Sequence, residues 1–268
     1  MPVTCANGID LYYEQAGAGP RLLFISGTGA DLRHSPRLTG APQFAAFALL
    51  EYDQRGLGQS AVPAGPYTMA DYADDAAGLL DAVGWDACLV LGVSFGGMVA
   101  QELAIRHPER VRRLVLACTS AGGTGGASYP LHELVGPDAQ ESLETRLQLL
   151  DTRWDAAWRA DNTEMVTMIA EGFQLGGADG GPAEGPLLQL EARSHHDTSA
   201  RLGQICCPTL VCSGRFDGIA PPANSEFLAA KIPGAELRFF DGGHIFFMQD
   251  PAAMPTMCAF LGAAADPV

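Results

Sequence analysis

Basic residues are scarce in this chain. Lysine and arginine together number 16 in 268 residues, against 31 aspartates and glutamates, and the formal net charge is −15. A charge of this size repels the phosphate backbones of nucleic acids and the anionic headgroups of membranes. We therefore expect neither a nucleic-acid partner nor a membrane partner.

Long apolar runs are missing as well. No uninterrupted hydrophobic stretch approaches the roughly 20 residues that cross a bilayer as a helix. The first ten residues, MPVTCANGID, have neither the basic segment nor the apolar segment of a secretory signal. We expect a cytoplasmic protein.

Signatures of metals and cofactors are also absent. The seven cysteines are odd in number and scattered through apolar runs, such as those of Cys88 and Cys212, and we predict that they are reduced and buried. The adjacent pair Cys206 and Cys207 lacks the spacing of a metal site or a CxxC redox motif. The glycines of residues 26–31 do not form the G-x-G-x-x-G pattern of a dinucleotide site. The sequence predicts no metal and no organic cofactor.

The chain does contain a series of short, continuous apolar runs separated by turn residues. Hydrophobicity that is continuous rather than alternating is typical of strands buried on both faces, as in a parallel sheet. Helical patterns lie between several of the runs, so we expect an α/β fold. The six predicted strands are residues 21–25, 48–52, 88–91, 113–117, 209–212 and 236–240.

One predicted helix has a clear start signal. Thr68 can cap the helix through its hydroxyl, and Asp71, three residues on, can return the hydrogen bond. The acidic residues Asp71, Asp74 and Asp75 follow in the first turns, where the helix dipole favours negative charge. We expect these three carboxylates on a solvated face.

The alternation of strands and helices breaks off between residues 122 and 203. This segment has helical patterns at 141–150, 154–160 and 164–173, and no buried-strand run. We interpret it as a mostly helical insertion in one α/β domain, whose core consists of residues 1–121 and 204–268.

Ser94 lies in the stretch LGVSFGG, between a predicted strand and a predicted helix. A nucleophile on a sharp strand-to-helix turn needs small neighbours, and Gly92 and Gly96 flank Ser94 at the required spacing. The pattern G-x-S-x-G alone is moderate evidence, because glycine is abundant here. The strand before it and the helix after it strengthen the prediction of a nucleophile.

A serine hydroxyl needs a base, and the base needs an orienting carboxylate. His244 follows the last predicted strand, at the sheet edge where open α/β sheets bind ligands. Asp217 follows the strand at 209–212, in a turn where an Asx-turn or helix cap is the alternative interpretation. The chain order Ser94, Asp217, His244 favours a catalytic triad.

An oxyanion hole would complete such a site. The backbone N–H of Phe95, at the start of the helix after the nucleophile, is one candidate donor. The loop after residues 21–25 begins with Ser26 and Gly27, and the N–H of Thr28 is the second candidate. Phosphate binding is the rival interpretation of these loop glycines.

With these residues in place, the chain resembles the α/β-hydrolase superfamily over nearly its whole length. Residues 53–60, DQRGLGQS, look like the family's D-x-R-G-x-G-x-S turn, and residues 96–111 are similar to the helix after the nucleophile in small esterases, 3-oxoadipate enol-lactonases and C–C bond hydrolases. The resemblance implies a mostly parallel central sheet flanked by helices, with a helical cap, residues 122–203, inserted after the sixth strand of the family's sheet. Ser26 departs from the family, where many members have His before the glycine.

The leading functional hypothesis is a serine hydrolase that cleaves a carboxylic ester or lactone of a small to medium substrate through an acyl-enzyme. Three alternatives stay open. The same triad could hydrolyse a C–C bond beside a ketone, or pass an acyl group to peroxide as a cofactor-free perhydrolase or haloperoxidase. In a different class, the fold could serve as a non-catalytic ligand receptor.

Substrate contacts are harder to predict. Gly27, Trp154, Trp158 and Phe246 are candidates for the pocket, although aromatic stripes are more often packing. His34, with its neighbours Arg33 and Arg37, could pair with a substrate carboxylate. The sequence does not indicate an oligomeric state.

Overall fold

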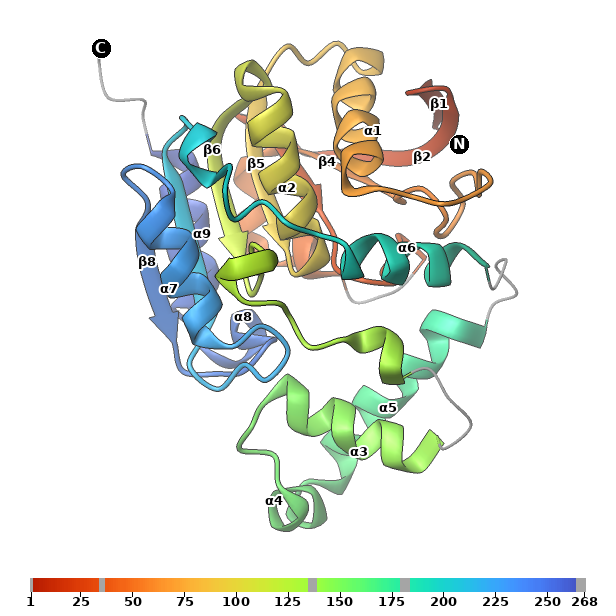
Figure 1. Ribbon diagram of the computed structural model, residues 1–268, viewed down its shortest axis with the longest axis vertical. Helices are drawn as coiled ribbons and strands as arrows, with labels where there is room; N and C mark the ends of the chain where they lie inside the picture. Colours follow the sequence, from red (N-terminus) through yellow and green to blue (C-terminus); the bar gives the residue numbers. More distant parts are fainter. Residues whose placement is uncertain (1, 34–36, 135–138, 179–183, 264–268) are drawn as a thin grey trace.

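An eight-stranded sheet forms the centre of the molecule (Figure 1) in a computed structural model that describes residues 2–33, 37–134, 139–178 and 184–263. The spatial order is β1-β2-β4-β3-β5-β6-β7-β8. All neighbouring pairs are parallel except β1 with β2 and β2 with β4. The predicted mostly parallel sheet is confirmed. Its strands are β1 (Val3–Ala6), β2 (Ile9–Ala16), β3 (Arg21–Ile25), β4 (Ala48–Tyr52), β5 (Cys88–Val93), β6 (Val111–Ala117), β7 (Thr209–Gly214) and β8 (Glu236–Phe240).

Helices cover both faces of the sheet, which explains the continuous apolar runs. In β5, Val90 faces a core built with α1 (Met69–Ala82) and α2 (Phe95–Arg106). Its neighbours Leu89 and Leu91 face a second core, which includes side chains of α8 (Phe246–Gln249) and α9 (Ala253–Gly262). Successive residues of a strand point to opposite faces of the sheet. A strand that is buried on both faces is therefore apolar throughout, without alternating polar residues.

The two N-terminal strands, β1 and β2, were not predicted. Asn7 and Gly8 join them with φ of 49° and 79°, the positive values that a tight hairpin turn requires. β1 forms the edge of the sheet and β2 lies next to it, and exposed residues interrupt the apolar runs of both strands. The Asn-Gly pair was the available sequence signal for this hairpin.

Between β6 and β7 the described chain is helical. Figure 1 shows α3, α4 and α5 grouped beyond the carboxyl ends of the central strands, with α6 between this group and the sheet. Helix α6 was not predicted, because a glycine-rich stretch precedes it. The four helices are α3 (Ala139–Leu150), α4 (Ala156–Asp161), α5 (Thr163–Ala178) and α6 (Glu184–Ser194).

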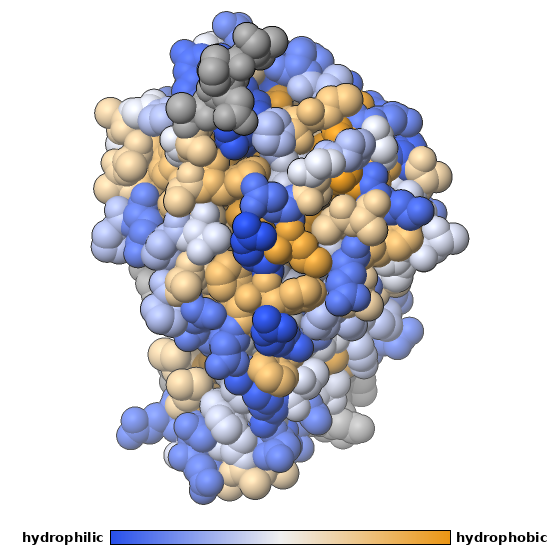
Figure 2. All heavy atoms as spheres, turned by 90° about the vertical axis from the view of Figure 1, so that its left-hand side faces the viewer, coloured by the Kyte–Doolittle hydropathy of each residue, from blue (hydrophilic) through white to orange (hydrophobic). Residues whose placement is uncertain are grey.

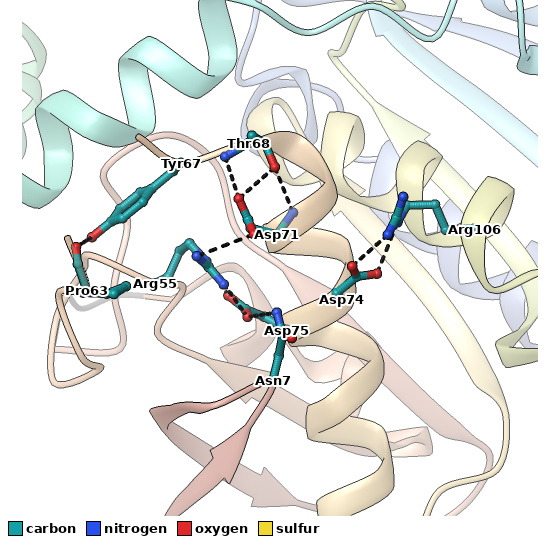
Figure 3. A network of polar contacts seen from close by, with 9 residues as sticks. All are labelled: Asn7, Arg55, Pro63, Tyr67, Thr68, Asp71, Asp74, Asp75 and Arg106. Atoms are coloured by element: carbon teal, nitrogen blue, oxygen red, sulfur yellow. Dashed lines mark hydrogen bonds and ion pairs between the residues drawn. The ribbon is translucent and has the colours of Figure 1, made fainter. Parts of the chain in front are cut away.

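Helix α1 begins at the predicted capping box, and its acidic residues have different environments (Figure 3). The Asp71 N–H donates to the Thr68 hydroxyl, and the Asp71 carboxylate accepts from the Thr68 N–H. Asp74 pairs with Arg106 near the surface. Asp75 is buried, in a bidentate pair with Arg55 at 2.6 Å, so its expected place on a solvated face is wrong. Burial raises the pKa of Asp75 although Arg55 opposes the shift.

The edge strand β8 is protected by charge. Glu236 and Arg238 are paired at 2.8 Å and about half exposed along this edge. Figure 2, which views the side of the molecule that carries β8, shows hydrophobic surface broken up by hydrophilic residues. Charged side chains on an edge strand oppose pairing with another chain. In the described part of the chain, no helix combines the length and apolarity needed to cross a membrane.

All seven cysteines are free. Cys88, Cys118 and Cys212 are buried, as predicted for cysteines in apolar runs. Cys5 and Cys206 are exposed, so the prediction of burial is wrong for these two, which lie on the N-terminal hairpin and in a surface turn before β7.

Candidate active site

Ser94 occupies a strained turn between β5 and α2. Its φ of 55° and ψ of −115° are rare for a residue with a side chain. The Ser94 N–H donates to the Ala117 carbonyl of β6 at 2.8 Å, and the Thr119 hydroxyl donates to the Ser94 carbonyl at 2.7 Å. These two hydrogen bonds hold the turn from both sides.

The glycines around Ser94 are required by close backbone approach. A Cβ on Gly96 would lie 2.0 Å from the Ile25 carbonyl oxygen of β3, and one on Gly92 would lie 2.4 Å from the Gly96 carbonyl oxygen. Real Cβ atoms do not approach backbone so closely. The G-x-S-x-G pattern therefore reflects the packing of the turn against its neighbouring strand.

Ser94, His244 and Asp217 form a continuous hydrogen-bonded relay. The Ser94 Oγ lies 3.0 Å from His244 Nε2, and His244 Nδ1 lies 2.8 Å from Asp217 Oδ2. All three residues are buried, and the Asp217 side chain has no exposed surface. This geometry suits a triad, in which the carboxylate accepts from the Nδ1–H group of the imidazole and Nε2 accepts from the serine.

Asp217 combines the two interpretations that its sequence context allowed. Its Oδ1 accepts hydrogen bonds from the Ile219 and Ala220 N–H groups, both at 2.8 Å, as in an Asx-turn. Its Oδ2 makes the shorter contact with His244. The turn hydrogen bonds fix the carboxylate in the orientation that holds the imidazole.

The loop that carries His244 is anchored to the end of α3. The His244 N–H donates to the Leu150 carbonyl, and a Cβ on Gly243 would lie 1.9 Å from that same oxygen. The Gly243 N–H donates to Gln249 Oε1, and Gln249 Nε2 donates to the buried carboxylate of Asp151, each at 2.8 Å. Sequence reasoning missed Gln249 and Asp151, because no motif marks either residue.

The two predicted oxyanion donors have free N–H groups. Within the described residues, neither Thr28 nor Phe95 donates its backbone N–H to another group. Gly27 lies close to Ser94, since a Cβ on it would be 3.5 Å from the Ser94 Cβ. Both predicted donors therefore keep a backbone N–H group that no described residue of the chain accepts.

Buried polar side chains hold the loop that contains Thr28. Gln189 of α6, which is fully buried, accepts from the Gly29 N–H at 2.8 Å. Asp53 accepts from the Leu32 N–H at 2.7 Å, and Gln54 donates to the Ser26 carbonyl at 3.0 Å. Sequence reasoning missed Gln189, because its partner lies 160 residues away and a single glutamine in a helix carries no signal.

The aromatic candidates for substrate contact are mostly packed against each other. Trp154 stacks on Trp158 with ring centroids 4.5 Å apart and packs beside Ile219, two residues after Asp217. Phe246 is fully buried and stacks on Phe240 at 5.1 Å. This burial favours a packing role for Phe246, because a side chain enclosed by the core has no surface left for a substrate.

The candidate carboxylate-binding arginines have protein partners. Arg33 makes a bidentate pair with Asp31, at 2.8 and 3.0 Å, and Arg37 pairs with Glu14 at 2.8 Å. The hypothesis that they pair with a substrate is therefore not supported. His34 lies outside the described residues.

Metal chemistry has no candidate centre in the part of the chain that the structure describes. No group of three or more His, Cys, Asp or Glu side chains there is arranged to hold an ion.

The family model of the alpha/beta hydrolase fold matches residues 20–168 and 172–251. Two relatives are similar over most of their length. One is 3-oxoadipate enol-lactonase 2 of Acinetobacter baylyi, 29% identical over 92% of this chain and 91% of the relative. The other is 2-hydroxymuconate semialdehyde hydrolase of Pseudomonas putida, 34% identical over 88% of this chain and 84% of the relative.

A solved structure is similar over the whole fold. The enol-lactonase from Burkholderia xenovorans LB400 superposes with a TM-score of 0.80 at 29% identity, covering 98% of this chain and all of that one. The expectation of a mostly parallel sheet with a helical insertion after the sixth strand is confirmed.

Proposed function

Since the chain belongs to the alpha/beta hydrolase fold family, we propose that it hydrolyses a carboxylic ester or lactone of a small to medium substrate, with Ser94 as nucleophile, His244 as general base and Asp217 as the residue that orients the base. The observation that carries the proposal is the relay of Ser94 Oγ, His244 and Asp217, with contacts of 3.0 and 2.8 Å. The relatives named as an enol-lactonase support the choice of a lactone or ester.

In the first half of the reaction, His244 Nε2 removes the proton of the Ser94 hydroxyl as Oγ forms a bond to the carbonyl carbon. The negative charge moves to the carbonyl oxygen, where the Thr28 and Phe95 N–H groups stabilise it. The C–O bond of the leaving group breaks, and His244 returns the proton to that oxygen. The acyl group then remains on Ser94.

Water completes the cycle in the second half. His244 takes a proton from water, whose oxygen attacks the acyl carbon and forms a second oxyanion. The bond to Ser94 Oγ breaks, His244 reprotonates the serine, and the acid leaves. For a lactone, the leaving oxygen and the acid belong to one opened product.

Helices α3 to α6 act in this proposal as a cap that shapes the pocket. Leu150 at the end of α3 binds the His244 backbone, and Gln189 of α6 binds the loop of Thr28. Ile219, just after Asp217, packs with Leu147, Leu150 and Trp154. Three of the loops that bear site residues therefore contact the cap.

The Ser94→Ala variant tests the assignment. We expect it to lose at least about 10³-fold in kcat on p-nitrophenyl acetate, because the triad acts as a unit. Circular dichroism checks that the fold is kept, and Ser199→Ala, outside the site, serves as the matched control. Undiminished ester hydrolysis by Ser94→Ala would overturn the assignment.

A second candidate, hydrolysis of a C–C bond beside a ketone, is favoured by the relative named as a 2-hydroxymuconate semialdehyde hydrolase. The same triad would serve, with His244 delivering the proton to carbon instead of oxygen. Parallel assays with an enol lactone and a vinylogous 1,5-diketone separate the two. A higher kcat/KM on the diketone would favour the second candidate.

A further inference from the structure

A cavity of about 130 Å³ lies beside the proposed active site, where the chain leaves the sheet after β6. Ser120, Gly122, Ser128, His132, Arg193 and His196 contribute to its walls. Ser94 is not among the lining residues, but Met98 is, and the Met98 N–H donates to the Ser94 carbonyl. The cavity is therefore adjacent to the nucleophile's turn and separate from the reacting atoms.

Arg193 brings a buried charge to this cavity. The residue is only 6% exposed, and among the described residues its guanidinium has one partner, the Tyr129 carbonyl oxygen at 2.8 Å from Nη1. Nε and Nη2 are buried without a protein partner in the described chain. Burial lowers the pKa of Arg193 to about 10, so the side chain is still a cation at neutral pH.

The other buried arginine of the core has a different environment. Arg55 is 7% exposed, almost the same as Arg193, yet it makes two 2.6 Å hydrogen bonds to the Asp75 carboxylate (Figure 3). A buried charge is costly unless a counterion and hydrogen bonds compensate for lost hydration. The buried Arg193 guanidinium has only one described partner, a neutral carbonyl oxygen. An anion from outside the chain would therefore form a charge-assisted hydrogen bond there and compensate for the lost hydration.

The polar groups around Arg193 suit a small planar anion. The guanidinium presents donors in a fork that matches a carboxylate. The Ser120 and Ser128 hydroxyls line the same cavity and are hydrogen-bonded to each other at 2.8 Å, so the one that accepts in this bond has its proton left to donate. Among the described residues that line the cavity, none is an aspartate or a glutamate.

We propose that this cavity is a binding site for a small carboxylate, held by the guanidinium of Arg193. The carboxylate can come from two sources. It is either an acid group on the substrate, which rests on the function proposed for Ser94, or a free carboxylic acid that binds independently of catalysis.

Calorimetric titration with succinate tests the site itself. Wild-type protein should bind succinate, and Arg193→Met should bind it about 10- to 100-fold more weakly, because a charge-assisted hydrogen bond is lost. Arg193→Lys should give an intermediate affinity, since lysine keeps the charge without the fork. Arg238→Met, which removes an exposed arginine, is the matched control and should bind as wild type does.

Kinetics identify the source of the carboxylate. If it belongs to the substrate, Arg193→Met lowers kcat/KM on mono-p-nitrophenyl succinate but not on p-nitrophenyl acetate. If it is a free ligand, the variant loses succinate binding and hydrolyses both esters as wild type does. Either result supports the site.

The proposal is overturned if wild type does not bind succinate, or if Arg193→Met and Arg193→Lys bind it as wild type does. Titration of Ser94→Ala with succinate keeps this outcome separate from a failure of the proposed function. Ser94→Ala retains Arg193, so its binding reports the cavity whether or not Ser94 is the nucleophile.

Discussion

Ser94 has an unfavourable backbone conformation and a favourable position in the fold. Its positive φ costs on the order of 1–3 kcal/mol, and the hydrogen bonds to Ala117 and from Thr119 hold it there. In this conformation the hydroxyl reaches His244 at the carboxyl end of the sheet. The strained backbone therefore places the Ser94 hydroxyl where the proposed reaction needs it.

The Asp217→Asn variant tests whether the Asp217 carboxylate orients the His244 imidazole or only fills a buried position. In this variant the side-chain NH₂ group replaces Oδ2 and donates to His244 Nδ1. This favours the tautomer with the proton on Nε2, which cannot accept the serine proton. We expect kcat on an activated ester to fall by about 10³- to 10⁴-fold, with little change in the melting temperature. Asp241→Asn, which changes an exposed aspartate near β8, is the control; equal losses in both variants would contradict the role of Asp217.

His196 predicts a pH dependence of stability. Burial lowers its pKa to about 4 from an ordinary 6.5, while Glu102 and Asp197 oppose the shift and Arg201 reinforces it. His196 thus binds a proton below about pH 6.5 in the unfolded chain, but only below about pH 4 in the folded chain. Stability should fall as the pH drops through this window, by about 3 kcal/mol in total.

Urea unfolding at several pH values measures this effect. His196→Gln should flatten the slope of the unfolding free energy between pH 6.5 and 4, while the exposed neighbour variant His195→Gln should keep it. An unchanged slope in His196→Gln would show that other groups dominate in this range.

Among the elements, α1 and the turn at residues 53–60 are joined by a buried ion pair. Arg55 and Asp75 lie in different segments, and Asn7 of the N-terminal hairpin donates to the same carboxylate at 2.9 Å. Three pieces of chain meet at one carboxylate. The turn around Arg55 is therefore a structural element.

Removing the carboxylate from α1 should be costly. Asp75→Ala leaves the Arg55 guanidinium buried without its counterion, and we expect a loss of about 3–5 kcal/mol in the free energy of unfolding. Asp74→Ala, one residue earlier, breaks a partly exposed pair with Arg106 and should cost about 1 kcal/mol or less. Chemical denaturation compares the two variants directly, and similar losses would contradict the distinction.

Helix α6 should influence catalysis through one hydrogen bond. Gln189→Ala removes the acceptor of the Gly29 N–H and frees the loop that presents Thr28. Because misplacement of a donor by about 1 Å can cost 100-fold, we expect kcat to fall by about 10- to 100-fold with little effect on folding. The exposed variant Gln204→Ala is the control, and full activity in Gln189→Ala would mean that the loop is held by other contacts.

At the scale of the whole molecule, the sequence predicted the elements with a repeated hydrophobic pattern and the residues that belong to a motif. Five of the six predicted strands were visible because both of their faces are buried, and Ser94, Asp217 and His244 because turn chemistry and chain order mark them. The run of β8 was predicted although this edge strand is half-exposed. Strand β1, at the other edge of the sheet, and its neighbour β2 were missed because exposure breaks their apolar pattern. The contacts of Gln189, Gln249 and Arg193 were missed because they join distant segments through single side chains without a motif.

The central claim, that Ser94 is an activated nucleophile, is tested most directly by covalent labelling. Folded wild-type protein is incubated with a fluorophosphonate, and the intact mass and the peptide map are recorded. We predict one adduct per chain, located on Ser94, and none on Ser94→Ala. A folded wild-type protein that acquires no adduct, or acquires it on another residue, would contradict the claim.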